Sequence, residues 1–300
     1  MRQVIFSPDG KYLVTNSHDG TVRNWNVKAR SEQLTLKGHE VEVVSAAFSP
    51  DGTVVATSAR DGTARLWSAV TGEVKAVLSG HRPNRVESIT FDPEGNRILT
   101  ASDDGTALLW DTAGTLLATL KHDAQIRDAR FSADGRLVVT ASFDRTARIW
   151  NSKTGELRVT LDGHTDWLRS AAFSPDGTRV ATTSRDGTGR IWDVFSGEEI
   201  AVLRGHRAEV WRSNFSPDGR RIVTASLDGT ARVWNSTTGE QVLELRGHTY
   251  RVWDAAYSND GRFIVTASGD GTARVWTEKG ELKFALIGHK RSSYDGGLQP

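Results

Sequence analysis

Residues 205–246, GHRAEVWRSNFSPDGRRIVTASLDGTARVWNSTTGEQVLELR, contain the pattern that decides the fold. The SPDG at 216–219 predicts a tight turn, because proline presets a suitable φ and glycine closes the turn. The β-branched run RIVTAS follows, then the hairpin signal DG at 228–229 and a third strand, TARVW. Residues 242–245 predict a fourth strand. The stretch therefore predicts four short antiparallel strands and no helix.

The same pattern recurs about every 42 residues along almost the whole chain. Seven of the ten tryptophans mark it, with spacings of 42, 43, 40, 42, 42 and 42 residues, and seven histidines keep the same period. A repeat of this length indicates stacked supersecondary units. The marker residues are Trp25, Trp67, Trp110, Trp150, Trp192, Trp234 and Trp276, with His39, His81, His122, His164, His206, His248 and His289.

A four-stranded sheet with two partly apolar faces is not stable alone, so each unit must pack against its neighbours. Seven such sheets packed face to face around an axis leave only short, protected edges. The sequence thus predicts an all-β protein, a seven-bladed β-propeller of four-stranded antiparallel blades. We expect one domain over residues 1–289 and a loose tail at 290–300. An aromatic residue in each first strand gives the same number of blades: Phe6, Phe48, Phe91, Phe131, Phe173, Phe215 and Tyr257.

The composition excludes several classes of protein. Of the 300 residues, 37% are hydrophobic and 25% are charged, which is ordinary for a globular domain. No apolar run approaches the roughly 20 residues of a membrane span. The absence of cysteine excludes disulfide scaffolds and thiolate zinc sites, and a net charge of +1 does not favour general nucleic-acid binding. We expect a cytoplasmic protein with no membrane partner and no cofactor.

These motifs resemble those of the WD-repeat β-propeller family over about residues 1–289. The resemblance is carried by Gly-His, Ser-Pro-Asp-Gly, Asp-Gly-Thr and the closing Trp of each repeat, and the repeated text TASxDGTARVW is similar to highly repetitive bacterial arrays. It implies a non-catalytic scaffold or sensor module that binds proteins, as part of a larger signalling protein. Because this fold hosts many roles, the resemblance specifies the fold better than the function.

The resemblance also implies a buried hydrogen-bond network in each blade, in which Asp holds His and Ser connects His to the indole N–H. A catalytic triad is needed once, whereas this set recurs, so we interpret it as structural. Ala59 replaces the Ser in blade two, which predicts an incomplete network there, and Arg145 replaces a turn glycine in blade four, which predicts a weak point. The network residues are His164, Ser184, Asp186 and Trp192; His206, Ser226, Asp228 and Trp234; His248, Ser268, Asp270 and Trp276; and His289 with Ser17, Asp19 and Trp25.

In this family, three positions per repeat line one narrow face of the propeller. Seven arginines on this face stand against four acids, Glu42, Glu87, Asp103 and Glu209, which gives it a charge of +3. Because Trp and Arg are enriched in binding hot spots, we expect partners with acidic and apolar side chains. The predicted partner-binding residues are Arg2, Arg60, Arg85, Arg127, Phe143, Trp167, Arg169, Arg185, Trp211, Leu227, Arg251 and Trp253.

Three other interpretations stay open. The face tryptophans would instead stiffen the edge of the propeller by packing on neighbouring strands. An enzyme in the central channel would use the four acids, although they share no spacing and no phosphate loop, HExxH or cysteine cluster accompanies them. Phosphate or nucleic-acid binding through the arginines would show a steep salt dependence. We predict no catalytic residue and no metal ligand.

Overall fold

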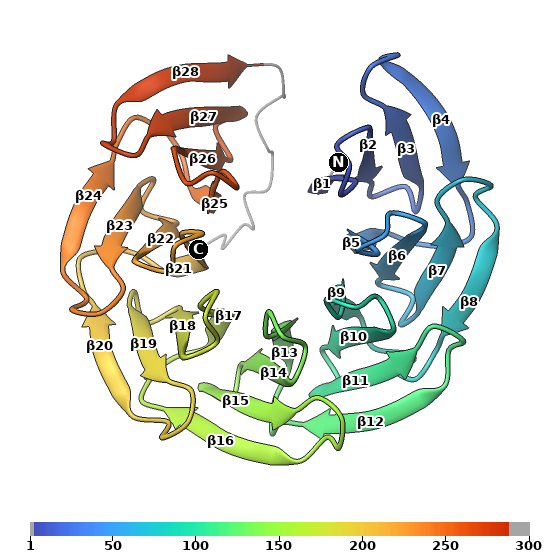
Figure 1. Ribbon diagram of the computed structural model, residues 1–300, viewed down its shortest axis with the longest axis horizontal. Helices are drawn as coiled ribbons and strands as arrows, with labels where there is room; N and C mark the ends of the chain where they lie inside the picture. The colour runs from blue at the N-terminus through green and yellow to red at the C-terminus, as the bar shows by residue number, and fades with distance from the viewer. Residues whose placement is uncertain (1–2, 288–300) are drawn as a thin grey trace, which may run out of the picture. The chain divides into compact units, whose positions relative to one another are not determined.

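The fold is built from β-strands alone in the part of the chain that the structure describes, residues 3–287 of a computed structural model. The strands form seven four-stranded antiparallel sheets, and within each sheet they follow chain order (Figure 1). The prediction of a seven-bladed β-propeller with four-stranded blades is confirmed. No helix in this part is long and apolar enough to cross a membrane.

The chain divides into two compact units, Met1–Thr160 and Leu161–Pro300. The boundary falls within the last strand of blade four, so blades one to four belong to the first unit and blades five to seven to the second. The predictions of a single domain over residues 1–289 and of a loose tail stay predictions, and residues 290–300 lie outside the described part.

The first unit contains 16 strands, the last of which crosses the boundary. They are β1 (Gln3–Phe6), β2 (Tyr12–Asn16), β3 (Val22–Asn26), β4 (Ser31–Leu36), β5 (Val43–Phe48), β6 (Val54–Ala59), β7 (Ala64–Ser68), β8 (Val74–Leu78), β9 (Val86–Phe91), β10 (Arg97–Ser102), β11 (Thr106–Asp111), β12 (Leu116–Lys121), β13 (Ile126–Phe131), β14 (Leu137–Ser142), β15 (Thr146–Asn151) and β16 (Leu157–Asp162).

The second unit contains the remaining strands. They are β17 (Leu168–Phe173), β18 (Arg179–Ser184), β19 (Gly189–Asp193), β20 (Glu199–Leu203), β21 (Val210–Phe215), β22 (Arg221–Ser226), β23 (Ala231–Asn235), β24 (Gln241–Leu245), β25 (Val252–Tyr257), β26 (Phe263–Ser268), β27 (Thr272–Thr277) and β28 (Leu282–Ile287).

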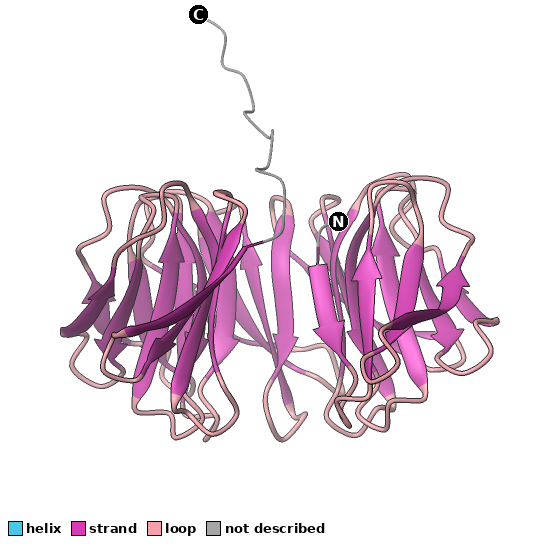
Figure 2. Ribbon diagram, turned by 90° about the horizontal axis from the view of Figure 1, so that it is seen from above, coloured by secondary structure: helices cyan, strands magenta, loops and turns pink. Residues whose placement is uncertain are grey.

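Each blade runs back and forth between two edges that carry its loops (Figure 2). The turn between the first and second strands lies at one edge, and the Asp-Gly turn between the second and third strands lies at the other. In blade five, β18 pairs with β19 so that Val180 lies opposite Trp192, which fixes the marker tryptophan on one face of the sheet. The two edges therefore present different residues of the repeat.

Apolar side chains fill the space between neighbouring blades of each unit. In the first unit, Leu66 and Leu78 of blade two pack with Ile98 and Trp110 of blade three, and all four are at least 95% buried. In the second unit, the equivalent core joins blades six and seven around Trp276. Burying one large side chain of this kind contributes roughly 3 kcal/mol, so the marker tryptophans hold adjacent blades together.

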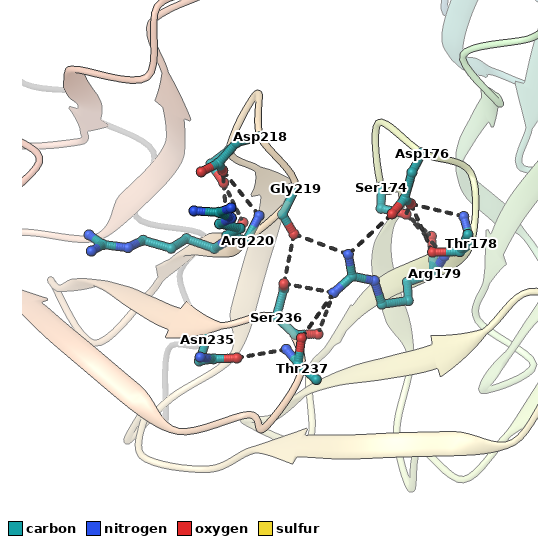
Figure 3. A network of polar contacts seen from close by, with 12 residues as sticks. Ser174, Asp176, Thr178, Arg179, Asp218, Gly219, Arg220, Asn235, Ser236 and Thr237 are labelled. Atoms are coloured by element: carbon teal, nitrogen blue, oxygen red, sulfur yellow. Dashed lines mark hydrogen bonds and ion pairs between the residues drawn. The ribbon is translucent and has the colours of Figure 1, made fainter.

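Arginines at the start of some second strands add a polar connection between blades. The Arg179 guanidinium of blade five donates to the Ser236 hydroxyl and carbonyl oxygens of blade six at 2.8 and 3.1 Å, and to the Gly219 carbonyl at 3.3 Å (Figure 3). Arg97 of blade three makes the same bonds to Ser152 of blade four. These connections lie at the edge of the Ser-Pro-Asp-Gly turns.

Candidate functional site

A chain of hydrogen bonds links the loop before the first strand to the second and third strands of each complete blade, as blade five illustrates. His164 Nδ1 lies 2.8 Å from the Asp186 carboxylate, and its Nε2 lies 2.9 Å from the Thr182 hydroxyl. The Trp192 indole N–H donates to the same hydroxyl at 2.8 Å. Because Asp186 accepts from Nδ1–H, Nε2 must accept from the threonine O–H, which fixes one neutral histidine tautomer.

Threonine, not serine, connects the histidine to the tryptophan, and this corrects the predicted roles of Ser17, Ser184, Ser226 and Ser268. Ser184 accepts from the Asp186 backbone N–H at 3.1 Å and donates to the Asp166 carbonyl at 2.9 Å, so it stabilises the turn. The reason is register. Val180 faces Trp192, so Thr182 is the diagonal neighbour within reach of the indole, whereas Ser184 lies two residues farther along the strand.

The same register explains why the prediction for blade two was wrong. His39 contacts Thr57 at 2.8 Å and Asp61 at 3.0 Å, and the Trp67 indole donates to Thr57 at 2.8 Å. The network is therefore complete despite Ala59, and only the serine bonds at the turn are missing. In blade one the Trp25 indole donates to Thr15 at 3.0 Å, while His289 lies outside the described residues.

The electrostatics of this network favour a structural role. Burial lowers the pKa of His164, although Asp186 opposes this. Burial also opposes ionisation of Asp186, but its hydrogen bonds with His164 and Thr188 hold the pKa of that carboxyl well below its usual range. Both imidazole nitrogens are occupied and His164 is 5% exposed, so the ring has no accessible atom for acid–base chemistry.

We call the predicted narrow face of the propeller the candidate face. In blades two to seven, one residue of the first strand belongs to this face, and in each of these blades it lies at a β-bulge. In blade five the register shifts between Leu168 and Ser170, so that Arg169 has no partner opposite it on β18. A bulge redirects its side chain and ends regular pairing. The bulged residues in blades two to seven are Val44, Glu87, Arg127, Arg169, Trp211 and Trp253.

In the first unit, buried carboxylates pair with the candidate arginines. Glu87, whose side chain is 2% exposed, lies 3.0 Å from Arg85 and forms an ion pair with Arg127. Burial raises the pKa of Glu87, the two arginines oppose this, and Asp103 adds to the rise. The positive charge here is largely neutralised within the unit.

Blades one and two show the same neutralisation. Glu42 lies 2.7 Å from Arg60 and 2.8 Å from His18, and its side chain is 8% exposed. The carboxylate is therefore enclosed by its own neighbours. Neither it nor Glu87 stands open to a substrate, which argues against the channel-enzyme interpretation for these acids.

In the second unit, aromatic rings and arginines alternate, and we call this set the tryptophan row. The Arg169 guanidinium lies 4.6 Å from the Trp211 ring and 5.9 Å from Trp167, and Trp211 meets Trp253 edge to face at 5.1 Å. Trp167 is 39% exposed. The tryptophan row consists of Trp167, Arg169, Arg185, Trp211, Tyr250, Arg251 and Trp253.

The structure thus brings together six of the predicted partner-binding residues and separates others from them. Arg60, Arg85 and Arg127 belong to the ion pairs of the first unit, Phe143 and Leu227 are half-buried, and Arg2 lies outside the described residues. Sequence reasoning missed Tyr250, which lies under Arg251 with 5.3 Å between the ring centre and the guanidinium. Only its position beside Arg251 in the loop signalled it.

Comparisons with known proteins match this architecture. The family described as WD domain, G-beta repeat matches residues 1–26, 30–68, 72–111, 114–151, 155–193, 197–235 and 239–277. A 45-residue stretch is 42% identical to the general transcriptional corepressor TUP1 of Saccharomyces cerevisiae and covers 15% of this chain and 6% of that protein. The crystal structure of the computationally designed Ika8 protein is similar with a TM-score of 0.86 and 29% identity, over 96% of this chain and 87% of that chain.

Proposed function

Because the chain belongs to the family of WD-domain, G-beta repeat proteins, whose fold is typical of protein-interaction scaffolds, we propose that it is a non-catalytic docking or sensor module of a larger signalling protein. Its partners are proteins or peptides that carry acidic and apolar side chains. The docking surface is the tryptophan row of blades five to seven. The ion-paired positions of the first unit stabilise their own blades and make little contact with the partner.

The observation that carries this proposal is the alternation of exposed or partly exposed aromatic rings with arginines. Arg185 stacks on Trp167 at 4.9 Å and is itself half-exposed, so both a cation and an apolar ring face solvent at the same place. Such stacking holds the guanidinium plane while its N–H groups stay directed outward. A partner carboxylate can bind these groups while an apolar side chain covers the ring.

Single-stranded nucleic acid is the competing ligand that this surface must be tested against, since bases also stack on aromatic rings beside arginines. The charge of the row argues for a peptide. Arg169 forms an ion pair with Glu209, and Arg185 lies 3.8 Å from Asp166. These acids would repel a phosphate backbone, whereas a peptide needs only one or two carboxylates.

A peptide-display selection tests the proposal. A phage library of random 12-residue peptides is panned on the wild-type chain and, in parallel, on the triple variant Trp167→Ala/Trp211→Ala/Trp253→Ala. Phe143→Ala serves as the matched control, because it removes an aromatic ring from the candidate face of the first unit. Melting temperatures of all variants are recorded to exclude unfolding.

We expect the wild type and Phe143→Ala to enrich peptides with Asp or Glu beside a large apolar residue, and the triple variant to enrich none. Three outcomes would overturn the proposal: no enrichment by the wild type, enrichment unaffected by the triple variant, or loss of binding with Phe143→Ala. Tight binding of oligo(dT), with a steep salt dependence, would assign the row to nucleic acid instead.

A further inference from the structure

Blade seven differs from the other blades at one position of the candidate face. The residue before the turn aspartate is Gly269, whereas blades one to six carry a side chain there: His18, Arg60, Asp103, Phe143, Arg185 and Leu227. The Gly269 N–H donates to the Arg251 carbonyl at 2.9 Å, so this glycine lies directly beside the loop that enters blade seven.

Two aromatic rings occupy the space that a side chain at residue 269 would need. A Cβ atom there would lie 2.6 Å from Tyr250 Cδ1 and 3.0 Å from Trp253 Nε1. The contact with Tyr250 is too short to exist, so the Tyr250 ring would have to move to make room for the added Cβ atom. The contact with Trp253 is also tight, and a rigid ring relieves it only by moving as a whole. Glycine thus allows Tyr250 and Trp253 to lie together over blade seven, with Trp211 edge to face against Trp253.

The arginine that lies over these rings is Arg251. Arg251 lies 5.3 Å from the Tyr250 ring and 6.0 Å from the Trp253 ring, and it forms no ion pair within residues 3–287. The other two arginines of the tryptophan row each have a carboxylate nearby, Glu209 or Asp166. The row therefore leaves one stacked cation available at its blade-seven end.

From these observations we infer that blade seven carries a subsite for a carboxylate beside an aromatic side chain of the partner peptide. Arg251 binds the carboxylate, and the shelf of Tyr250, Trp253 and Trp211 receives the aromatic ring, with Gly269 as the residue that shapes the shelf. The inference rests on the proposed docking function. It adds that blade seven binds the acidic and aromatic side chains of the partner peptide. Offset or edge-to-face contacts suit an incoming ring, and a stacked guanidinium suits a bidentate carboxylate.

The test repeats the phage selection of random 12-residue peptides with variants that change one element of the subsite each. Gly269→Ala adds the obstructing Cβ and removes no aromatic ring, and Arg251→Gln removes the charge. Leu227→Ala is the matched control, because it changes the same repeat position in blade six without filling space. Tyr250→Ala provides a second way to remove the shelf if Gly269→Ala lowers the melting temperature.

We expect Gly269→Ala and Tyr250→Ala to lose the preference for an aromatic residue, and Arg251→Gln to lose the preference for an adjacent acid. A wild-type-selected peptide should bind each of them about tenfold more weakly, and Leu227→Ala should bind within about twofold of wild type. Unchanged preferences in all three variants would overturn this inference. The docking proposal would then still stand if the triple tryptophan variant fails to bind, whereas no enrichment by the wild type would overturn both.

Discussion

The first and second units use the same repeat positions differently, although the second unit also keeps one ion pair there, between Arg169 and Glu209. In blades two to four, the bulged residues and their neighbours form ion pairs around Glu42 and Glu87, whose side chains are at most 8% exposed. In blades five to seven, the same positions hold Trp167, Trp211 and Trp253, which stack with arginines at the surface. The blades of both units therefore share one scaffold, but the residues of the candidate face form buried ion pairs in the first unit and aromatic–arginine contacts in the second.

If the tryptophan row is the docking surface, as we propose, this difference separates stability from recognition. An ion pair with a buried carboxylate satisfies charges within the unit and leaves little for a partner. A row of rings and guanidinium groups stays partly exposed, and a ligand that covers it gains both apolar burial and charge-assisted hydrogen bonds.

The largest expected effect concerns the network that both units share. Thr57→Val in blade two and Thr182→Val in blade five should each destabilise the protein by about 3 kcal/mol, because each leaves a buried histidine nitrogen and an indole N–H unsatisfied. Chemical denaturation monitored by circular dichroism measures both. Ser184→Ala should cost only about 1 kcal/mol, and a larger cost for Ser184→Ala than for Thr182→Val would contradict the assignment of the link to threonine.

Acid should weaken both units together. Burial lowers the pKa of His122 in the first unit and of His164 and His248 in the second. Because the folded state then binds fewer protons than the unfolded state, this stability is present above pH 6.5, the ordinary pKa of histidine, and is lost as the pH falls below it. Each histidine contributes at most about 1.4 kcal/mol per pH unit to this loss.

Melting curves at pH 8, 7, 6 and 5 check this expectation. The melting temperature should be nearly constant above pH 7 and fall below it, with one transition at every pH. Two separate transitions would mean that the units differ in their scaffolds as well as at the face, and a rise on acidification would refute the neutral-histidine network.

Removing the charge of an ion-paired carboxylate should destabilise the protein more in the first unit than in the second. Glu87→Gln should destabilise the protein by about 2 kcal/mol, since the charge that offsets Arg85 and Arg127 is lost from a buried site. Glu209→Gln should cost about 1 kcal/mol, because the side chains of Glu209 and Arg169 are each 13% exposed. If urea denaturation gave the reverse order, the carboxylate of the second unit would be the more important for stability.

The smallest expected effect lies in blade seven. The Tyr257 hydroxyl is buried without a hydrogen-bond partner among the described residues, and burial raises the pKa of Tyr257 well above its usual range. The six other blades carry Phe at this position. Tyr257→Phe should therefore be neutral or stabilising by about 0.5 kcal/mol, and should leave peptide binding unchanged. Destabilisation in a thermal melt would show that the hydroxyl has a partner.

The sequence predicts the fold because the deciding signals are local and repeated. The turn motifs and the period of Trp and His need no tertiary information. The residue that connects histidine to tryptophan was predictable only in part, because choosing threonine over serine requires the strand register. The sequence does show that a threonine recurs at this position in all seven repeats: Thr15, Thr57, Thr100, Thr140, Thr182, Thr224 and Thr266.

The candidate site was less predictable for a physical reason. Whether an arginine is neutralised depends on its neighbour in space, and Glu87 reaches Arg127 of the next blade. Gly269 matters because it has no side chain, which no sequence pattern indicates. Only the structure shows that the rings of Tyr250 and Trp253 occupy the space that a Cβ atom at residue 269 would need.

The most direct test of the account is a hydrogen-exchange footprint of a peptide that the wild type selects. The tryptophan row predicts slower backbone exchange at residues 165–169, 209–211 and 250–253 when the peptide is bound, with no change at 42–44, 85–87 and 125–127. Protection confined to the latter segments would contradict the assignment of docking to the second unit.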